Sequence, residues 1–495
     1  MQKVIFTALL LSHALSAASD HIRIFYSANR QGEIEPCGCK TNQIGGLNRM
    51  AEKIMAASKS GDYLIVDSGD TFFSTPKLNE NRKAQELLRA RLIAKSYRQM
   101  GVAFTTPGDR DLAGGAAYYS ELLAESGASA VSANWVAKDS TLRLSPYQIW
   151  SRDGLKILVT GLSAAEGVSP AIAEMVEPRR AMEGVLSVAK KEAVDFVLVL
   201  SHLGKETDEK LAEQFPGLFV FGAHSMDSLS EPIAIGNSFV LQPGTEGQQL
   251  GELQLEKGKT GFLEHALHDL SKNFDQPNAV KSLMQEYYAS LKQVGLQDSA
   301  DLLPGKSSYV ANPFVCKNCH QKQFDFWAST KHSSAFLVLY AKKQHYDPQC
   351  IGCHSLGFNV PEGFSQLSSA ILLSPQKKKG FAEKLLEKTF SGDREGALDS
   401  SENPARYRRL HERYWKEVRK LLGNAPNAKN FLGVQCEHCH QSRANHVQNQ
   451  SRGASGVSLE SCQQCHRPPN ASPLDPKSLV VVACPKMGQL NKEKP

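Results

Sequence analysis

The sequence lacks any apolar run after residue 18 that approaches the roughly 18 residues a membrane-spanning helix requires. It also lacks internal repeats and low-complexity tracts. Its charges nearly balance, with a net +6 over 495 residues, so a nucleic-acid-binding protein is not expected. The 41% apolar fraction argues against a disordered or collagen-like chain. The length exceeds that of one compact domain, so we expect two or three.

The first residues have the composition of an export signal. Lys3 provides a basic start, Ile5–Leu15 an apolar stretch, and Ser16–Ala18 the small residues typical of a cleavage site. The stretch contains no cysteine for lipidation. We therefore predict a signal peptide over residues 1–18 and an exported, periplasmic protein with no transmembrane anchor after cleavage. An uncleaved anchor is the alternative, because the apolar segment is short and contains His13.

Eight of the eleven cysteines form four Cys-x-x-Cys-His motifs. Their residues are Cys316, Cys319 and His320; Cys350, Cys353 and His354; Cys436, Cys439 and His440; and Cys462, Cys465 and His466. In such a motif both thiols form thioethers with the vinyl groups of one haem, and the histidine ligates the iron. The motifs predict four covalently attached haem c groups. Two Cys₄ zinc sites are the alternative, but zinc does not explain the histidine after every second cysteine.

The charges of the two halves differ in a way that fits this prediction. Residues 311–495 contain 26 Lys and Arg against 15 Asp and Glu, a net +11, whereas residues 1–310 contain 31 against 36, a net −5. Four haems would bring about eight propionate charges to the basic region. The sequence thus predicts two modules of opposite charge.

Further histidines could ligate the haem irons from the other side. In two places a histidine follows a haem motif closely: His332 after Trp327, and His446 after the motif that Gly433 and Val434 precede. These segments resemble the multihaem cytochrome c family typified by cytochrome c-554. The resemblance implies that His332 and His446 are distal iron ligands.

Three other histidines of this half carry weaker predictions. His345 and His411 are expected on a loop or a helix surface, and His438 lies between two attachment cysteines. Two convincing distal ligands for four irons leave at least one haem that could be five-coordinate and bind a small ligand.

The N-terminal half alternates apolar, strand-like runs with helical stretches such as Asn81–Gln99. The predicted strands are Ile22–Tyr26, Tyr63–Asp67, Lys156–Thr160, Phe196–Ser201 and Phe219–Gly222. This alternation predicts a layered α/β domain, with ligands at the ends of its strands.

Short polar motifs follow several of these strands, and in their order they resemble the 5'-nucleotidase branch of the metallophosphoesterases. The resemblance covers about residues 20–256 and implies metal ligands at Asp70, Asp109, His202 and His224. The family places asparagine where this chain has Asp109, but a carboxylate can also ligate a metal ion. We predict at most one divalent metal ion at these residues, with a metal-free scaffold as the alternative.

The other family positions are changed. Ser27 and Asn29 replace the ligands on the first strand, Arg110 replaces the usual catalytic histidine, and Met226 stands where the last ligand would be. Two-metal hydrolysis needs both ions to generate hydroxide and to hold the phosphate oxygens. The sequence therefore argues against an active phosphoesterase.

A Pro36-Cys37-Gly38-Cys39 segment resembles a nucleotidase-like subgroup in which selenocysteine can replace the second cysteine. The resemblance implies redox or soft-metal chemistry at Cys37 and Cys39. A disulfide across one glycine would be strained and easily reduced. An inert structural bridge is the alternative.

These observations predict a layered α/β metallophosphoesterase-like domain over residues 19–256, a connecting helix and linker over 257–310, and a mainly α-helical, haem-packed cytochrome domain over 311–495. The connecting helix is expected around Ala279–Gln293. We predict a periplasmic electron carrier that serves donor and acceptor proteins. The alternatives are a multihaem enzyme acting on a small nitrogen, sulfur or thiol substrate, and a metal-dependent phosphoesterase.

Overall fold

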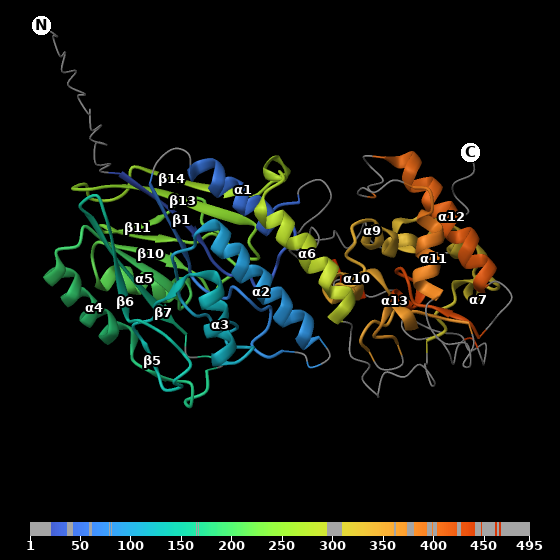
Figure 1. Cartoon of the computed structure of the whole chain (residues 1–495), viewed down its shortest axis with the longest axis horizontal. Helices are drawn as coiled ribbons and strands as arrows, with labels where there is room; N and C mark the ends of the chain where they lie inside the picture. The colour runs from blue at the N-terminus through green and yellow to red at the C-terminus, as the bar shows by residue number, and fades with distance from the viewer. Residues whose placement is uncertain are drawn as a thin grey trace, which may run out of the picture.

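The computed structural model describes most of the chain, which forms two halves (Figure 1). The described residues are 21–36, 43–58, 62–78, 80, 82–164, 166, 168–294, 309–360, 363–373, 381–393, 398, 403–422, 427–440, 447, 461–462 and 465–466. The predicted signal peptide, Cys37, Cys39 and His446 lie outside them. Within these ranges, no helix has the length and apolar character needed to cross a membrane.

The N-terminal half contains two six-stranded sheets, and most neighbouring strands in their centres run parallel. The first sheet has the order β14 (Glu264–Asp269), β13 (Gln249–Glu256), β1 (His21–Ser27), β2 (Tyr63–Asp67), β3 (Phe104–Thr105), β4 (Ser129–Ala130). The second has the order β11 (Ile233–Ile235), β12 (Ser238–Leu241), β10 (Leu218–Gly222), β9 (Phe196–His202), β7 (Leu155–Ser163), β6 (Tyr147–Arg152). A small pair is formed by β5 (Trp135–Ala137) and β8 (Ala173–Met175).

The strands carry apolar residues on both faces: one set of alternate residues packs between the two sheets, and the other set packs against helices. In β1, Ile22 and Ile24 are buried in the core between the sheets, whereas Phe25 is buried against helices. In β9, Leu198 belongs to the core between the sheets and Val199 to the outer core. This period of two explains why the strands could be predicted as continuous apolar runs.

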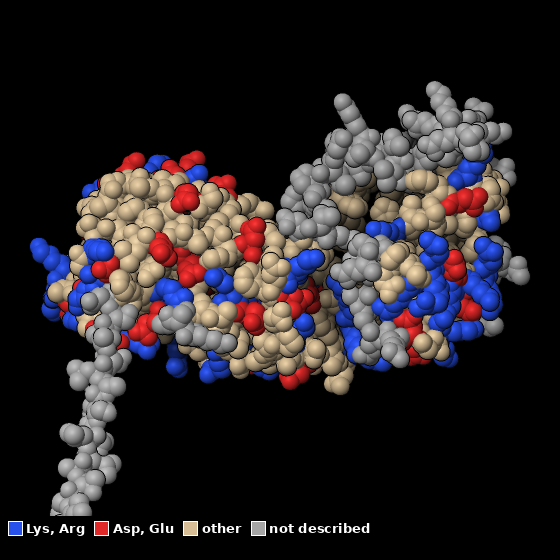
Figure 2. All heavy atoms as spheres, turned by 90° about the horizontal axis from the view of Figure 1, so that it is seen from above, with Lys and Arg blue, Asp and Glu red and all other residues tan. Residues whose placement is uncertain are grey.

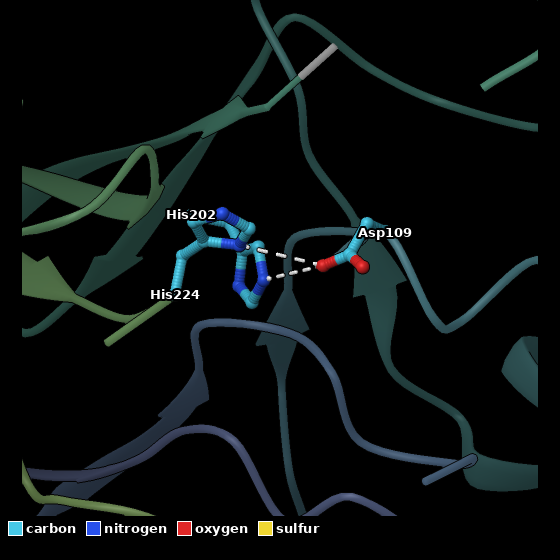
Figure 3. Close-up of side chains that lie close together, drawn as sticks. All are labelled: Asp109, His202 and His224. Atoms are coloured by element: carbon cyan, nitrogen blue, oxygen red, sulfur yellow. Dashed lines mark ion pairs between the residues drawn. The ribbon is translucent and has the colours of Figure 1, made fainter. Parts of the chain in front are cut away.

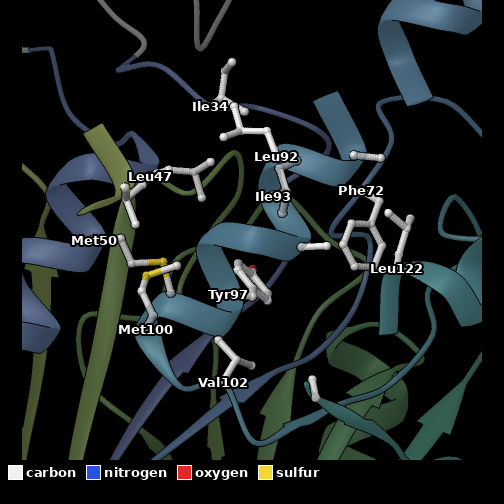
Figure 4. Packing of buried hydrophobic residues seen from close by; sticks show 14 of the residues in the cluster. Ile34, Leu47, Met50, Phe72, Leu92, Ile93, Tyr97, Met100, Val102 and Leu122 are labelled. Atoms are coloured by element: carbon white, nitrogen blue, oxygen red, sulfur yellow. The ribbon is translucent and has the colours of Figure 1, made fainter. Parts of the chain in front are cut away.

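Helices cover both outer faces of the pair of sheets. The first sheet is covered by α1 (Leu47–Ser58), α2 (Lys83–Met100), α3 (Ala116–Ser126) and α6 (Ala279–Val294), and the second by α4 (Pro178–Glu192) and α5 (Lys205–Gln214). Figure 4 shows Leu92, Ile93 and Tyr97 of α2 among side chains from α1 and α3. Both β14 and α6, from the predicted connecting segment, thus pack with the N-terminal half.

The C-terminal half is mainly helical, as predicted, and has its own apolar core. Its helices are α7 (Pro313–Lys317), α8 (Gln321–Ser329), α9 (Ala335–Ala341), α10 (Pro348–His354), α11 (Phe381–Phe390), α12 (Pro404–Leu422) and α13 (Cys436–His440), with a small sheet of β15 (Ile371–Leu372) and β16 (Lys429–Asn430). The fold class predicted from the sequence is confirmed for both halves.

Candidate functional site

The polar motifs of the N-terminal half meet where β2, β3, β9 and β10 end. Asp70 follows β2, Asp109 follows β3, His202 ends β9 and His224 follows β10. Parallel strands place their carboxyl ends at the same edge of a sheet. Because β2 and β3 belong to the first sheet and β9 and β10 to the second, and the two sheets are packed together, residues far apart in the chain meet there. Figure 3 shows Asp109 facing both imidazole rings.

Three of the four predicted metal ligands form a compact group. Asp109 Oδ1 lies 3.3 Å from His202 Nε2 and 3.4 Å from His224 Nδ1. The three ligand atoms lie within 4.8 Å of one another. His202 Nδ1 lies 2.9 Å from the carbonyl oxygen of Ser68 and donates to it, which turns Nε2 toward the carboxylate.

The charges of this group depend on one another. Burial alone would raise the pKa of Asp109, but its contacts with His202 and His224 outweigh burial and hold the pKa well below its usual range. Burial alone would lower the pKa of His202, yet Asp109 and Asp70 raise it to about 10. Without a metal ion, the site therefore holds a carboxylate beside a protonated imidazole.

The fourth predicted ligand, Asp70, lies beside the group but is engaged elsewhere. Its Oδ1 is 3.5 Å from His202 Nε2 and accepts a hydrogen bond from the backbone N–H of Arg110 at 2.9 Å. Arg110 Nε lies 3.2 Å from Asp70 Oδ2. Arg110 thus contacts both carboxylate oxygens of Asp70, one through its backbone and one through its side chain.

Asp111 was not singled out from the sequence, although it organises this edge. Its carboxylate accepts hydrogen bonds from the backbone N–H groups of Asp70, Thr71, Phe72 and Gly108, at 2.8–3.0 Å. The loops after β2 and β3 are thereby joined. The sequence shows that Asp111 lies two residues after Asp109, but it does not show which backbone N–H groups the carboxylate binds.

The residues at the altered first-strand positions make structural contacts instead of ligating. Ser27 Oγ donates to Asp67 Oδ2 at 2.5 Å. Asn29 Oδ1 accepts from the backbone N–H of His224 at 3.2 Å and so supports the turn that carries this histidine. Met226 is 63% exposed. Among the residues that the structure describes, one group of metal-ligating side chains remains at this edge.

The donor set suits one divalent cation. Two imidazole nitrogens and a carboxylate oxygen form a set that zinc commonly takes, with a fourth position left for water or a ligand. His202 Nε2 and Asp109 Oδ1 are buried and make no aligned hydrogen bond. Buried polar atoms of this kind favour a ligand between them, so the residues fit a metal ion.

Three of the four haem motifs lie on or beside short helices, two of which have matching starts. Asn312 caps α7 by accepting from Phe314 N at 3.1 Å, and Asp347 caps α10 by accepting from Gln349 N at 3.0 Å. Proline is the first helical residue in both. One helical turn places the first and fourth residues of a motif on one side, as two thioethers to one haem require.

The motifs approach one another in pairs. The thiol of Cys316, in the first motif, contacts that of Cys436, in the third. Cys465, in the fourth, lies 4.0 Å from the carbonyl oxygen of Cys353, in the second. His438, inside the third motif, also lies 3.0 Å from the carbonyl oxygen of Ser355, directly after the second, so the two pairs adjoin.

The histidines of this half have different surroundings. His354 Nδ1 lies 2.8 Å from the carbonyl oxygen of Ala335 and donates to it, which leaves Nε2 for iron. The ring of His332 lies 5.9 Å from that of His466. His438 is held at both nitrogens, by Gln435 N and the carbonyl oxygen of Ser355. His446 was predicted as a second distal ligand but lies outside the described residues.

A cavity of about 550 Å³ adjoins the first haem motif. Phe314, Phe324 and Trp415 form apolar walls, and its remaining lining residues are Ala328, His411, Glu412, Lys416, Arg419 and Lys420. An apolar slot with a cationic rim suits a flat hydrophobic group that carries carboxylates. The cysteines and histidines of the motifs, together with this cavity, fit the predicted haem.

Comparison with protein families connects the C-terminal half to known cytochromes. Residues 315–374 match the family described as cytochrome c554 and c-prime. This match confirms the resemblance that Trp327 and the neighbouring motifs indicated. The comparison with curated protein sequences found no match.

Several solved structures are similar to the chain. They include the Thermus thermophilus sulfate thiohydrolase SoxB in complex with glycerol (18% identity, TM-score 0.47, 56% of this chain and 62% of that chain). A 5'-nucleotidase precursor from Thermus thermophilus also matches (17% identity, TM-score 0.48, 62% of this chain and 67% of that chain). So does the Haemophilus influenzae NAD nucleotidase NadN (14% identity, TM-score 0.49, 66% of this chain and 68% of that chain). The chain thus spans less than two thirds of the first of these.

Proposed function

We propose that this chain is an exported tetrahaem cytochrome c that carries electrons between protein redox partners. The observation that carries the proposal is the approach of the four haem motifs, with Cys316 at Cys436 and Cys465 near Cys353. Haems attached at neighbouring motifs would lie close together, as electron transfer between them requires.

The charge of the C-terminal half supports haem binding. Figure 2 shows Lys and Arg gathered over this half on the face in view. α12 alone carries Arg406, Arg408, Arg409, Arg413, Lys416, Arg419 and Lys420. Lys416, Arg419 and Lys420 line the cavity beside the first motif, where they can pair with propionates.

For the N-terminal half we propose one bound divalent cation and no phosphate-ester hydrolysis. Asp109, His202 and His224 would hold the cation, which would supply a Lewis-acidic position for a ligand. Arg110 pairs with Asp70, and Ser27 and Asn29 hold neighbouring loops. The groups that a second ion would need are therefore committed to other contacts.

The first experiment counts haems. Protein matured with its own export and haem-attachment machinery should show a mass increase of four haems and a c-type absorption spectrum. Replacing both cysteines of one motif, as in Cys350→Ala with Cys353→Ala, should remove one haem. Fewer than four haems on the unaltered chain would contradict the proposal.

A redox enzyme is the second candidate, because distal ligands are few. His438 is held at both nitrogens, and His411 Nε2 lies 3.0 Å from Ser333 Oγ. An iron without a distal histidine would be high-spin and would bind carbon monoxide. Low-spin signals from all four haems, with no response to carbon monoxide, would favour the electron carrier over the enzyme.

A further inference from the structure

A buried ion pair joins the two halves of the molecule. Arg89 Nη2, on α2, lies 2.8 Å from Asp347 Oδ1, which comes directly before α10. The two side chains are 5% and 3% exposed. Arg89 Nε also donates to the hydroxyl of Tyr287 on α6, at 3.3 Å. A charge pair this deeply buried adds little net stability but fixes how its partners sit, because either charge alone would be costly.

A second polar contact lies at the same junction. Glu35 Oε1 accepts hydrogen bonds from the hydroxyl of Tyr288, at 2.8 Å, and from Gln344 Nε2, at 2.9 Å. Burial raises the pKa of Glu35. Directional contacts from two points hold the halves in one arrangement, so the surroundings of α10 include residues of the N-terminal half.

Asp347 also shapes the second haem motif directly. The Oδ1 atom that binds Arg89 accepts the hydrogen bond from Gln349 N that caps α10. α10 carries Cys350, Cys353 and His354. Arg89 is thus one contact away from the helix that would hold the second haem.

The charges of the junction also act on this motif. Burial raises the pKa of the partly buried Cys350 thiol; Asp347 raises it further and Arg89 lowers it. An electric field that changes the energy of a thiolate at Cys350 would also change that of an iron ligated a few residues away. Inside a protein such charges are weakly screened.

We propose that the N-terminal half sets the reduction potential of the haem attached at Cys350 and Cys353, with Arg89 as the positioning residue. The proposal rests on haem attachment at this motif. Arg89 offsets the Asp347 carboxylate and fixes the cap of α10. Loss of the guanidinium leaves a negative charge beside the haem, which stabilises ferric over ferrous iron.

The test is potentiometric titration of the haem-loaded full chain, followed by absorption spectroscopy. Arg89→Gln should lower one haem potential, by a shift of order tenfold in the one-electron equilibrium, about 59 mV. Asp347→Asn keeps a capping side chain but leaves the guanidinium uncompensated, so it should raise that potential. The double variant should return toward the unaltered value, and Arg89→Lys should stay close to it.

Arg91→Gln is the matched control, because Arg91 lies on the same helix and forms ion pairs, but its side chain is 43% exposed. It should leave every potential unchanged. If Arg89→Gln yields too little folded protein, Asp347→Asn decides, since an unchanged or lowered potential overturns the proposal. If four haems are attached and neither Arg89→Gln nor Asp347→Asn changes any of their potentials, this inference is overturned and the proposed function is not. A missing haem at the second motif of the unaltered chain would overturn the proposed function itself.

Discussion

At the scale of single residues, Asp109 connects the candidate metal ligands. Its Oδ1 lies within 3.4 Å of a nitrogen of each histidine. Glu166 Oε2 reaches 3.7 Å from His224 Nε2, but this side chain is 80% exposed. The ligand set therefore depends on Asp109 and tolerates changes at Glu166.

The metal site is tested by zinc binding. The unaltered protein, stripped with a chelator and incubated with zinc, should retain one zinc per chain after gel filtration. Asp109→Ala removes the only anionic ligand of the group, so zinc affinity should fall by about tenfold or more. Glu166→Ala is the control and should bind as before. Equal zinc binding by all three proteins would contradict the site.

His332 gives a second prediction at this scale. Burial, together with His466 and His354, lowers the pKa of His332, which keeps the imidazole neutral as a ligand must be. His332→Ala should convert one low-spin haem to high spin in the absorption and electron paramagnetic resonance spectra. His345→Ala is the control, because His345 packs between Tyr340 and Tyr346. An unchanged spectrum for His332→Ala would show the assignment to be wrong.

At the scale of elements, Glu252 joins two strands to a helix. Glu252 on β13 is 2.8 Å from His268 Nε2 on β14 and 3.1 Å from Lys53 Nζ on α1. The hydrogen bond from His268, with a smaller contribution from Lys53, lowers its pKa to about 2 against the effect of burial. The ionised carboxylate therefore stabilises this side of the first sheet.

This pKa sets the sign of a pH effect. Because the folded pKa lies below the unfolded value, the contribution is present at neutral pH and is lost as pH falls from about 5 toward 2. At pH 7, Glu252→Gln should reduce the free energy of unfolding by at most about 1 kcal/mol after solvent screening, and the melting temperature should fall accordingly. The difference from the unaltered protein should shrink at pH 3. The exposed Glu264→Gln should show little effect at either pH.

At the scale of the whole molecule, the two sheets bring motifs from four strands to one edge, where Asp109, His202 and His224 meet. Tyr26 and Phe221, from different sheets, pack with ring centroids 4.9 Å apart in the core between them. This packing fixes the edge whether or not metal binds.

We expect negligible hydrolysis of nucleoside monophosphates and model phosphate esters with added zinc, manganese or magnesium. Arg110 lies against Asp70 and cannot act as a neutral imidazole does. Phosphate release measured colorimetrically should match that of Asp70→Ala protein. Metal-dependent release that Asp70→Ala abolishes would overturn the expectation.

Local patterns carried most of what could be predicted from the sequence. Tyr63–Asp67 was predicted with the bounds that β2 has, because an uninterrupted apolar run is buried on both faces. The haem motifs were recognisable because their chemistry lies within five residues. Asp111 and the Arg89–Asp347 pair could not be predicted, since their roles come from contacts up to 258 residues apart. The division into two packed sheets likewise depends on pairing between distant strands.

Cys37 and Cys39 remain a prediction from the sequence, but their neighbour Glu35 binds Gln344 of the other half. The segment before this pair therefore reaches the junction. Alkylation after mild reduction should add two labels between residues 33 and 47, unless bound metal blocks them until a chelator is added. Resistance under both treatments would favour the structural bridge.

The Arg89–Asp347 pair also has a consequence for the order of biosynthesis. A chain is made from its N-terminus, and the first domain commonly folds while the rest is still being synthesised. Until residues 344 and 347 have been made, Arg89 therefore lacks Asp347 and Glu35 lacks Gln344. Because α10 also carries Cys350 and Cys353, a haem attached at this motif would be attached to the same short helix that closes the junction. If haem is attached there, we expect the attachment machinery to reach this motif most easily before the two halves close.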